Sequence, residues 1–70
     1  MTLRDAIEGR EYQIQRINTE DRELDAFLFS LGCYVGGAIT VVAHRRSGCT
    51  VSIRDGRYSI DRHLAQAIVV

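Results

Sequence analysis

The 70-residue chain contains no proline and no lysine. Without proline, six glycines are left to mark the turns between segments. All nine basic residues are arginine, whose planar guanidinium suits carboxylate contacts and protein interfaces, although a high-GC coding bias would produce the same pattern. The nine arginines are balanced by nine acidic residues, and the resulting net charge of zero argues against a nucleic-acid-binding protein.

Cysteine and long apolar runs are also scarce. Cys33 and Cys49 are the only cysteines, too few for the disulfide framework of a small secreted protein. The apolar run over residues 65–70 is interrupted by Gln66 and is too short to span a bilayer, and no apolar signal segment follows Met1. We therefore expect a cytoplasmic protein without membrane insertion. Its length predicts a single domain over residues 1–70, with a thin core and no room for a deep substrate cleft.

Hydrophobic periodicity predicts one helix and several strands. The helix is indicated by apolar residues at positions i, i+3, i+4 and i+7, which are Leu24, Phe27, Leu28 and Leu31. Asn18 and Thr19 are expected to cap its start, and Gly32 to end it. Alternation of apolar and polar residues predicts strands over 12–17, 39–44, 49–54, 58–60 and 67–70, with short helical turns over 2–7 and 62–66.

These segments predict a mainly β fold. The dipeptide Asp55-Gly56 is typical of a tight hairpin, and Asp61 is placed to cap the helical turn that follows it. Five short strands, with one α-helix inserted after the first, suit a small closed barrel, which leaves few strand edges exposed.

No constellation of residues in the sequence indicates catalysis. Asp55 and Asp61 flank the last hairpin, where acidic residues are structural by default. The glycine-rich stretch 32–37 follows a helix, whereas a phosphate-binding loop must precede one. We therefore expect neither an enzyme nor a bound nucleotide or other cofactor.

The soft metal ligands of the chain are His44, His63, Cys33 and Cys49. Their spacing matches none of the common zinc-binding or metalloprotease patterns. Cys49 shares the inward strand phase of Val51 and is expected to be a small buried side chain. We expect no dedicated metal site.

Four residues are the candidates for partner contact. Phe29 lies nearly opposite the apolar stripe of the helix, so it either packs on the N-terminal turn at Leu3 and Ile7 or is an exposed aromatic anchor. Tyr34 follows the helix in a surface loop, and Arg45 and Arg46 occupy a hairpin tip, expected beside Tyr34. Exposed tyrosine next to arginine is typical of an interface hot spot. Residues 33–70 carry five arginines against two acids, which would attract an acidic partner.

The order of glycines and aliphatic residues along nearly the whole chain resembles the ferrous iron transport protein A family. The resemblance is carried by Leu28-x-x-Leu31-Gly32, Gly36, Ile39-x-Val41, Gly48, Val51-x-Ile53, Gly56 and Ala65-x-x-Ile68-x-Val70. It implies an SH3-like barrel and a cytoplasmic accessory protein of bacterial ferrous iron uptake, which binds and modulates the membrane ferrous iron transporter.

Two other functions remain open from the sequence. Similar domains occur at the C-terminus of iron-dependent repressors, so the chain could be a metal-responsive regulatory module; no helix-turn-helix precedes the expected barrel, which weighs against this. The other alternative is a generic protein-interaction barrel, which could be associated with RNA. The balanced charge and the lack of interleaved surface aromatics argue against the association with RNA.

Overall fold

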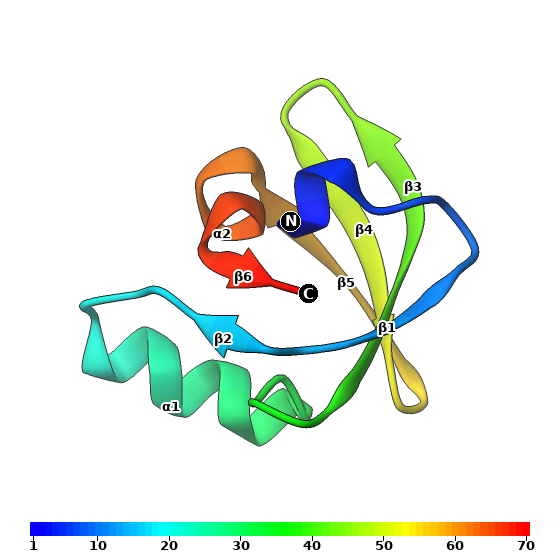
Figure 1. Cartoon of the computed structure of the whole chain (residues 1–70). Coiled ribbons are helices and arrows are strands. Elements are labelled where there is room, and N and C mark those ends of the chain that lie inside the picture. The colour runs from blue at the N-terminus through cyan, green and yellow to red at the C-terminus, as the bar shows by residue number, and fades with distance from the viewer.

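Antiparallel strands curl around one apolar core in the computed structural model, which describes residues 1–70 (Figure 1). The larger sheet has the strand order β1-β3-β4-β5, and a smaller one pairs β2 with β6. Neither helix has the length and apolar content that crossing a bilayer requires. A 3-10 turn at Leu3–Asp5 precedes the other elements, which are β1 (Glu11–Gln13), β2 (Arg16–Ile17), α1 (Arg22–Leu31), β3 (Ala38–Arg45), β4 (Gly48–Ile53), β5 (Gly56–Asp61), α2 (Arg62–Ala67) and β6 (Ile68–Val69).

The core lies between the larger sheet and the helices and is made of aliphatic side chains and the two cysteines. Strand β4 contributes Cys49, Val51 and Ile53, all buried, at every second position. The alternating pattern in the sequence predicted this inward phase, and the structure confirms it. Ile39 and Val41 of β3 face the same core.

The segment 12–17, which the sequence predicts as one strand, is two strands in the structure. β1 pairs with β3, whereas β2 pairs with β6. Between them the Ile14 amide donates to the carbonyl of Gly37 at 2.8 Å, and the Gln15 amide donates to the carbonyl of Val69 at 2.8 Å. The chain therefore passes from one sheet to the other and closes the barrel at this point. The mainly β class, with a helix after this first segment, is confirmed.

Helix α1 starts later than predicted. The Asp21 carboxylate caps it, because Oδ1 accepts from the amides of Glu23 at 2.9 Å and Leu24 at 3.2 Å. Thr19, predicted as part of the cap, instead donates from its hydroxyl to the Asp25 carboxylate at 2.8 Å. The predicted end is confirmed, since Gly32 adopts the left-handed conformation with φ of 96°.

The β4–β5 hairpin is present, but its loop lies one residue earlier than predicted. Ile53 pairs with Gly56, so the two loop residues are Arg54 and Asp55. Gly56 instead begins β5, where the Tyr58 ring covers it so closely that a Cβ at this position would overlap the ring. The cap of α2 is as predicted: the Asp61 carboxylate accepts from the Leu64 amide at 2.7 Å.

Candidate interaction surface

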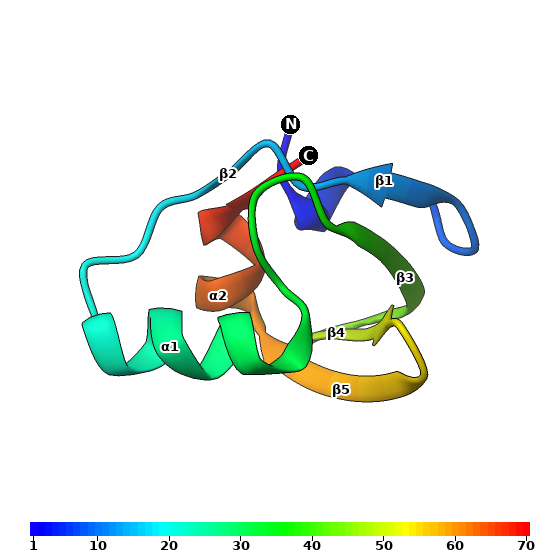
Figure 2. The ribbon, with the colours of Figure 1, turned by 90° about the horizontal axis from the view of Figure 1, so that it is seen from below.

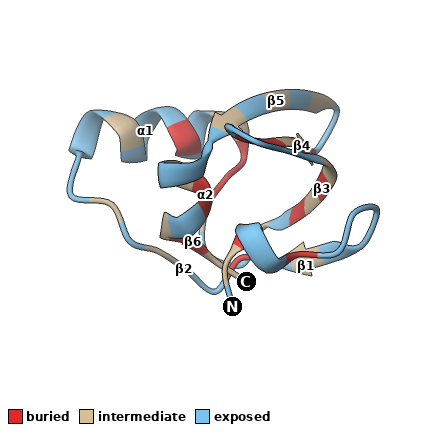
Figure 3. Ribbon diagram, turned by 90° about the horizontal axis from the view of Figure 1, so that it is seen from above, coloured by how far each residue is buried: buried red, intermediate tan, exposed pale blue.

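Helix α1 buries one side chain and exposes two phenylalanines. Leu28 is buried in the core, whereas Phe29 is 67% exposed and Phe27 is 58% exposed. Successive helical residues turn by about 100°, so the two phenylalanines lie on either side of the buried Leu28 direction. Figure 3 shows the resulting pattern, with α1 exposed over most of its length. The prediction that Phe27 joins the core stripe is wrong, and so is the alternative in which Phe29 packs on the N-terminal turn.

The loop after α1 is held in place by backbone hydrogen bonds. The Cys33 amide donates to the Leu28 carbonyl at 2.8 Å, and the Cys33 side chain is buried. Further along, the Gly36 amide donates to the carbonyl of Ile14 at 2.8 Å, with φ of 90° at Gly36. Tyr34 lies between these two fixed points. The backbone on both sides of Tyr34 is therefore held by hydrogen bonds, and this fixes the position of the loop that carries its ring.

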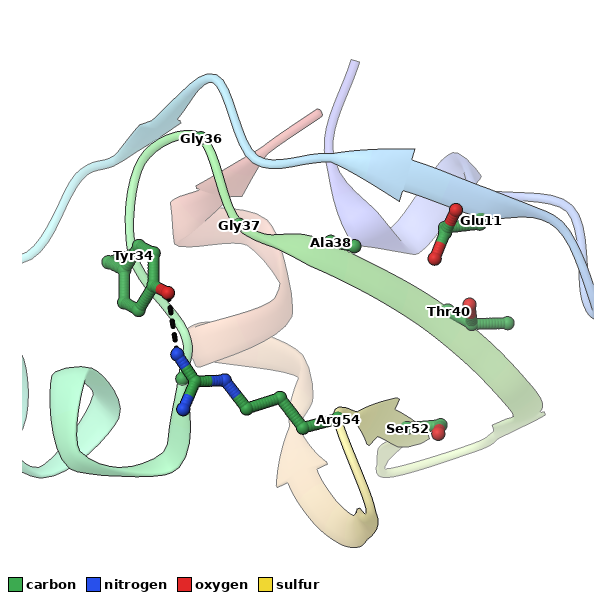
Figure 4. Close-up of a pocket in the computed structure, with 9 residues that line it drawn as sticks. Glu11, Tyr34, Gly36, Gly37, Ala38, Thr40, Ser52 and Arg54 are labelled. Carbon is green, nitrogen blue, oxygen red and sulfur yellow. Dashed lines mark hydrogen bonds between the residues drawn. The ribbon is translucent and has the colours of Figure 1, made fainter.

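Tyr34 contacts Phe29 on one side and Arg54 on the other. The Phe29 and Tyr34 ring centroids are 5.2 Å apart with an interplanar angle of 41°, within the range of favourable aromatic pairs. Arg54 donates from Nη2 to the Tyr34 hydroxyl at 2.7 Å, and its Cζ lies 5.7 Å from the ring centroid. Figure 4 shows the Tyr34 and Arg54 side chains directed toward each other. We name these three residues the Phe29–Tyr34–Arg54 cluster.

Arg54 was not among the predicted site residues. It is the one non-glycine residue with positive φ, 54°, which is uncommon for a side chain that lacks a local hydrogen-bonding group. Its side chain crosses Gly32, where a Cβ would approach Nε to 2.9 Å. The sequence gives no signal for this arrangement, because it depends on the hairpin loop lying one residue earlier than the Asp55-Gly56 motif suggests.

A polar groove of about 440 Å³ lies beside the cluster (Figure 4). Its floor is a cross-strand row in which Glu11 of β1 pairs with Thr40 of β3, which pairs with Ser52 of β4. Tyr34 and Arg54 form the wall opposite Glu11. The groove thus offers the Glu11 carboxylate at one side, the Thr40 and Ser52 hydroxyls on its floor, and at the other side the Tyr34 ring and the Arg54 guanidinium, whose partners, the hydroxyl and ring of Tyr34, are not anions. Such a surface suits binding of a polypeptide with an acidic or amide side chain.

Arg45 and Arg46 are exposed, as predicted, but they do not lie beside Tyr34. Arg45 pairs with Gly48 at one end of β4, whereas Arg54 follows Ile53 at the other end. At about 3.3 Å per residue, the length of β4 separates the two ends by roughly 20 Å. The structure thus brings Phe29 and Tyr34 together and leaves the two arginines at the opposite hairpin, where Arg45 Nε donates to the Thr50 hydroxyl at 3.3 Å.

The soft metal ligands are dispersed. Cys33 and Cys49 are buried in the core, and burial raises the pKa of the Cys33 thiol to about 11 and raises the pKa of Cys49 as well. His44 is hydrogen-bonded to the Ala6 carbonyl at 2.6 Å through Nε2, and His63 is exposed on α2. No group of three or more His, Cys, Asp or Glu side chains is arranged to hold a metal ion.

A family model described as the FeoA domain matches residues 1–70, the whole chain. The chain belongs to the FeoA domain family. This confirms the resemblance drawn from the glycine and aliphatic pattern. A comparison of this chain's sequence with curated proteins found no match.

Solved structures with the same fold agree with this assignment. The solution structure of iron(II) transport protein A from Clostridium thermocellum has a TM-score of 0.84 and 20% identity, over 99% of this chain and 43% of that chain. The crystal structure of an iron uptake regulatory protein, FeoA, has a TM-score of 0.82 and 22% identity, over 97% of this chain and 91% of that one. ScaR with bound Cd²⁺ has a TM-score of 0.80 and 21% identity, over 97% and 32% of the two chains.

The TM-scores of 0.84 and 0.82 establish a shared fold, and they confirm the SH3-like barrel. The FeoA domain described here spans less than half the length of two of these three proteins.

Proposed function

We propose that this FeoA domain is a cytoplasmic accessory protein of bacterial ferrous iron uptake. It binds the cytoplasmic part of a membrane ferrous iron transporter and modulates the transporter's nucleotide-driven activity, without catalysing a reaction itself. Membership of the FeoA domain family supports a role in ferrous iron transport. The structural likeness to iron(II) transport protein A and to a protein named an iron uptake regulatory protein is consistent with that role.

The exposed Phe29 carries the part of the proposal that concerns binding. A large aromatic side chain that is 67% exposed contributes little to the core of its own chain. Here it is backed by the Tyr34 ring, which is fixed in turn by Arg54. A rigid aromatic pair with an adjacent arginine is the composition of an interface hot spot, because it loses little side-chain entropy on binding.

Arg45 and Arg46 have a different role in the proposal. They lie roughly 20 Å from Tyr34, as judged from the length of β4 at about 3.3 Å per residue. A hot spot and its rim can extend over this distance in an interface of ordinary size. The two arginines then increase the rate of association with an acidic partner surface rather than anchoring it, and their contribution decreases as salt is added.

The proposal is tested with the purified chain and the detergent-solubilised ferrous iron transporter of the same organism. We expect the two to co-purify, and the transporter's nucleotide hydrolysis to change when the chain is added. The Arg45→Ala/Arg46→Ala double variant should bind with a slower association rate at low salt and an unchanged dissociation rate. Absence of both co-purification and any change in hydrolysis would exclude the transporter as the partner.

The second candidate is a metal-responsive regulatory module. It is favoured by the match to ScaR, solved with bound Cd²⁺, in which the matching part is about a third of the chain. In that case the partner recovered from cells would be a transcription regulator rather than the transporter. A pull-down from cell extract and solubilised membranes with the chain as bait therefore distinguishes the two functions, and recovery of RNA instead would indicate an RNA-associated barrel.

A further inference from the structure

Strand β5 is an edge strand with an unpaired side. It ends the sheet order β1-β3-β4-β5 and is paired with β4 alone. The pair Ile53 and Gly56, which flanks the two-residue loop, is a hydrogen-bonded pair, and such pairs alternate along an antiparallel ladder. Gly56, Tyr58 and Ile60 therefore bond to β4. The backbone groups of Arg57, Ser59 and Asp61 point away from it.

The free side of β5 is protected only by the charges of Arg57 and Asp61, which a partner strand of matching charge can neutralise. Its register with β4 contains no bulge, and it has neither proline nor lysine. Arg57, Ser59 and Asp61 are exposed, while the residues between them are half-buried. In Figures 2 and 3 β5 runs along the outer rim of the ribbon, on the side of the molecule away from β1. Free backbone groups on such an edge strand are a template for pairing with another chain.

The sequence of β5 is complementary to itself in one antiparallel register. When two copies pair about Ser59, Ser59 faces Ser59 of the second copy and Arg57 faces its Asp61. Tyr58 then faces Ile60 on the half-buried face of the sheet, and two pairs of opposite charge form on the exposed face. Asp61 retains its role in α2, because the cap uses Oδ1 and leaves Oδ2 free for the arginine.

Other registers are disfavoured by charge. Pairing about Arg57 places two arginines opposite each other, and pairing about Tyr58 places Asp61 opposite Asp55 of the second copy, both unfavourable. A parallel arrangement in register also aligns like charges. Pairing about Ser59 is the register that joins all three outward residues and matches every charge.

We propose that two copies of this chain associate through β5, antiparallel and centred on Ser59, so that their sheets become continuous. The Ser59 backbone groups exchange hydrogen bonds, and the Asp61 amide of each copy donates to the Arg57 carbonyl of the other. One strand pair is a small interface, so the dimer is weak and concentration-dependent. This dimerisation is separate from the proposed transporter binding, and each dimer carries two copies of the Phe29–Tyr34–Arg54 cluster.

The test is sedimentation equilibrium of the full chain between about 10 µM and 1 mM, a range that covers weak interfaces of this size. We expect the mass to rise from monomer to dimer. Arg57→Asp should weaken the dimer by about tenfold or more, because both charge pairs become repulsive. The matched control Arg22→Asp, the same charge change on α1, should leave the dimer unchanged. Ser59→Pro removes the outward amide alone and should abolish the dimer while the circular dichroism spectrum is retained.

A charge-swap mixture tests the register itself. Arg57→Asp and Asp61→Arg each place like charges opposite one another in their own dimers, whereas a one-to-one mixture restores both charge pairs. We expect the mixture to dimerise more tightly than either variant alone. A wild-type chain that stays monomeric at 1 mM, or a dimer that tolerates both Ser59→Pro and Arg57→Asp, would overturn the proposal. Should Asp61→Arg fail to fold for want of its cap, these two variants still decide the outcome.

Discussion

Phe29 and Leu28 are neighbours on α1, and replacing each by alanine should lower the stability by very different amounts. Phe29 is 67% exposed, so only about a third of its surface is buried. Full burial of a phenylalanine stabilises by about 1.5–3 kcal/mol, so a third of this is about 0.5–1 kcal/mol. Adding the exposed contact with Tyr34, we expect Phe29→Ala to lower the free energy of unfolding by about 1 kcal/mol, and by no more than about 2 kcal/mol.

Leu28→Ala provides the comparison within the same helix turn. Leu28 is 2% exposed, and its truncation leaves a cavity in the core, which costs about 2–5 kcal/mol. A 70-residue domain is stable by only about 4–10 kcal/mol, so this change removes a large part of the total.

Urea denaturation followed by circular dichroism measures both variants, with equal m-values indicating that only stability has changed. If Phe29→Ala destabilised the chain as much as Leu28→Ala, Phe29 would be a core residue. It would then be unavailable to a partner, and the reasoning for the interaction surface would be refuted.

Four further results are expected. Gly48→Ala should destabilise the chain by about 3 kcal/mol or more in urea denaturation, because a Cβ there would overlap the Ile60 carbonyl and the Asp61 backbone. Gly36→Ala has open space around it and should cost only the strain of its positive φ, about 1–2 kcal/mol. Cys33 and Cys49 should resist iodoacetamide at pH 8 until the chain is unfolded, as mass spectrometry would reveal. Because the unfolded chain loses the Cys33 proton near pH 9 and the folded chain near pH 11, stability is intact below pH 9 and should decrease from pH 9 to 11. Excess Fe²⁺ under reducing conditions should leave Tm unchanged, whereas a saturable rise abolished by His44→Ala would contradict the absence of a metal site.

The parts of the fold that depend on local pattern were predictable from the sequence. Helix α1 and its end at Gly32 follow from apolar spacing and one residue type, and the buried phase of β4 follows from strict alternation. The sequence did not decide whether Phe29 is exposed. The helical phase places Phe29 away from the apolar stripe, but it does not show whether another segment of the chain covers that side of the helix. The structure resolves this in favour of an exposed side chain.

What could not be predicted depends on contacts between distant residues. The division of segment 12–17 into two strands is imposed by bonds to Gly37 and Val69, which only the closed barrel brings near. The hairpin loop lies at Arg54 and Asp55 because Ile53 pairs with Gly56, and this register belongs to the whole β4–β5 ladder, which a dipeptide motif does not encode.

Contacts between distant residues also explain which site residues were predicted and which were missed. Tyr34 and Arg54 are twenty positions apart and meet only after the sheet curls, so Arg54 was missed and the Arg45–Arg46 hairpin was wrongly expected beside Tyr34. The residues that α1 and its loop provide were identified, since Phe29 and Tyr34 are close in sequence and in space. The partner that would complete the interface is a different polypeptide, which this sequence does not encode.

Phe27 provides the control for the most direct test of the interaction surface. It is an exposed phenylalanine on the same helix, 58% against 67% for Phe29, but it lies outside the Phe29–Tyr34–Arg54 cluster. The measurement is the affinity of the Phe29→Ala and Phe27→Ala chains for the solubilised ferrous iron transporter, made by calorimetry. We predict that Phe29→Ala weakens binding by about 30-fold or more, the effect of removing a hot-spot anchor, while Phe27→Ala changes it by less than about threefold. Equal affinities of the two variants and the wild-type chain would contradict the assignment of this surface.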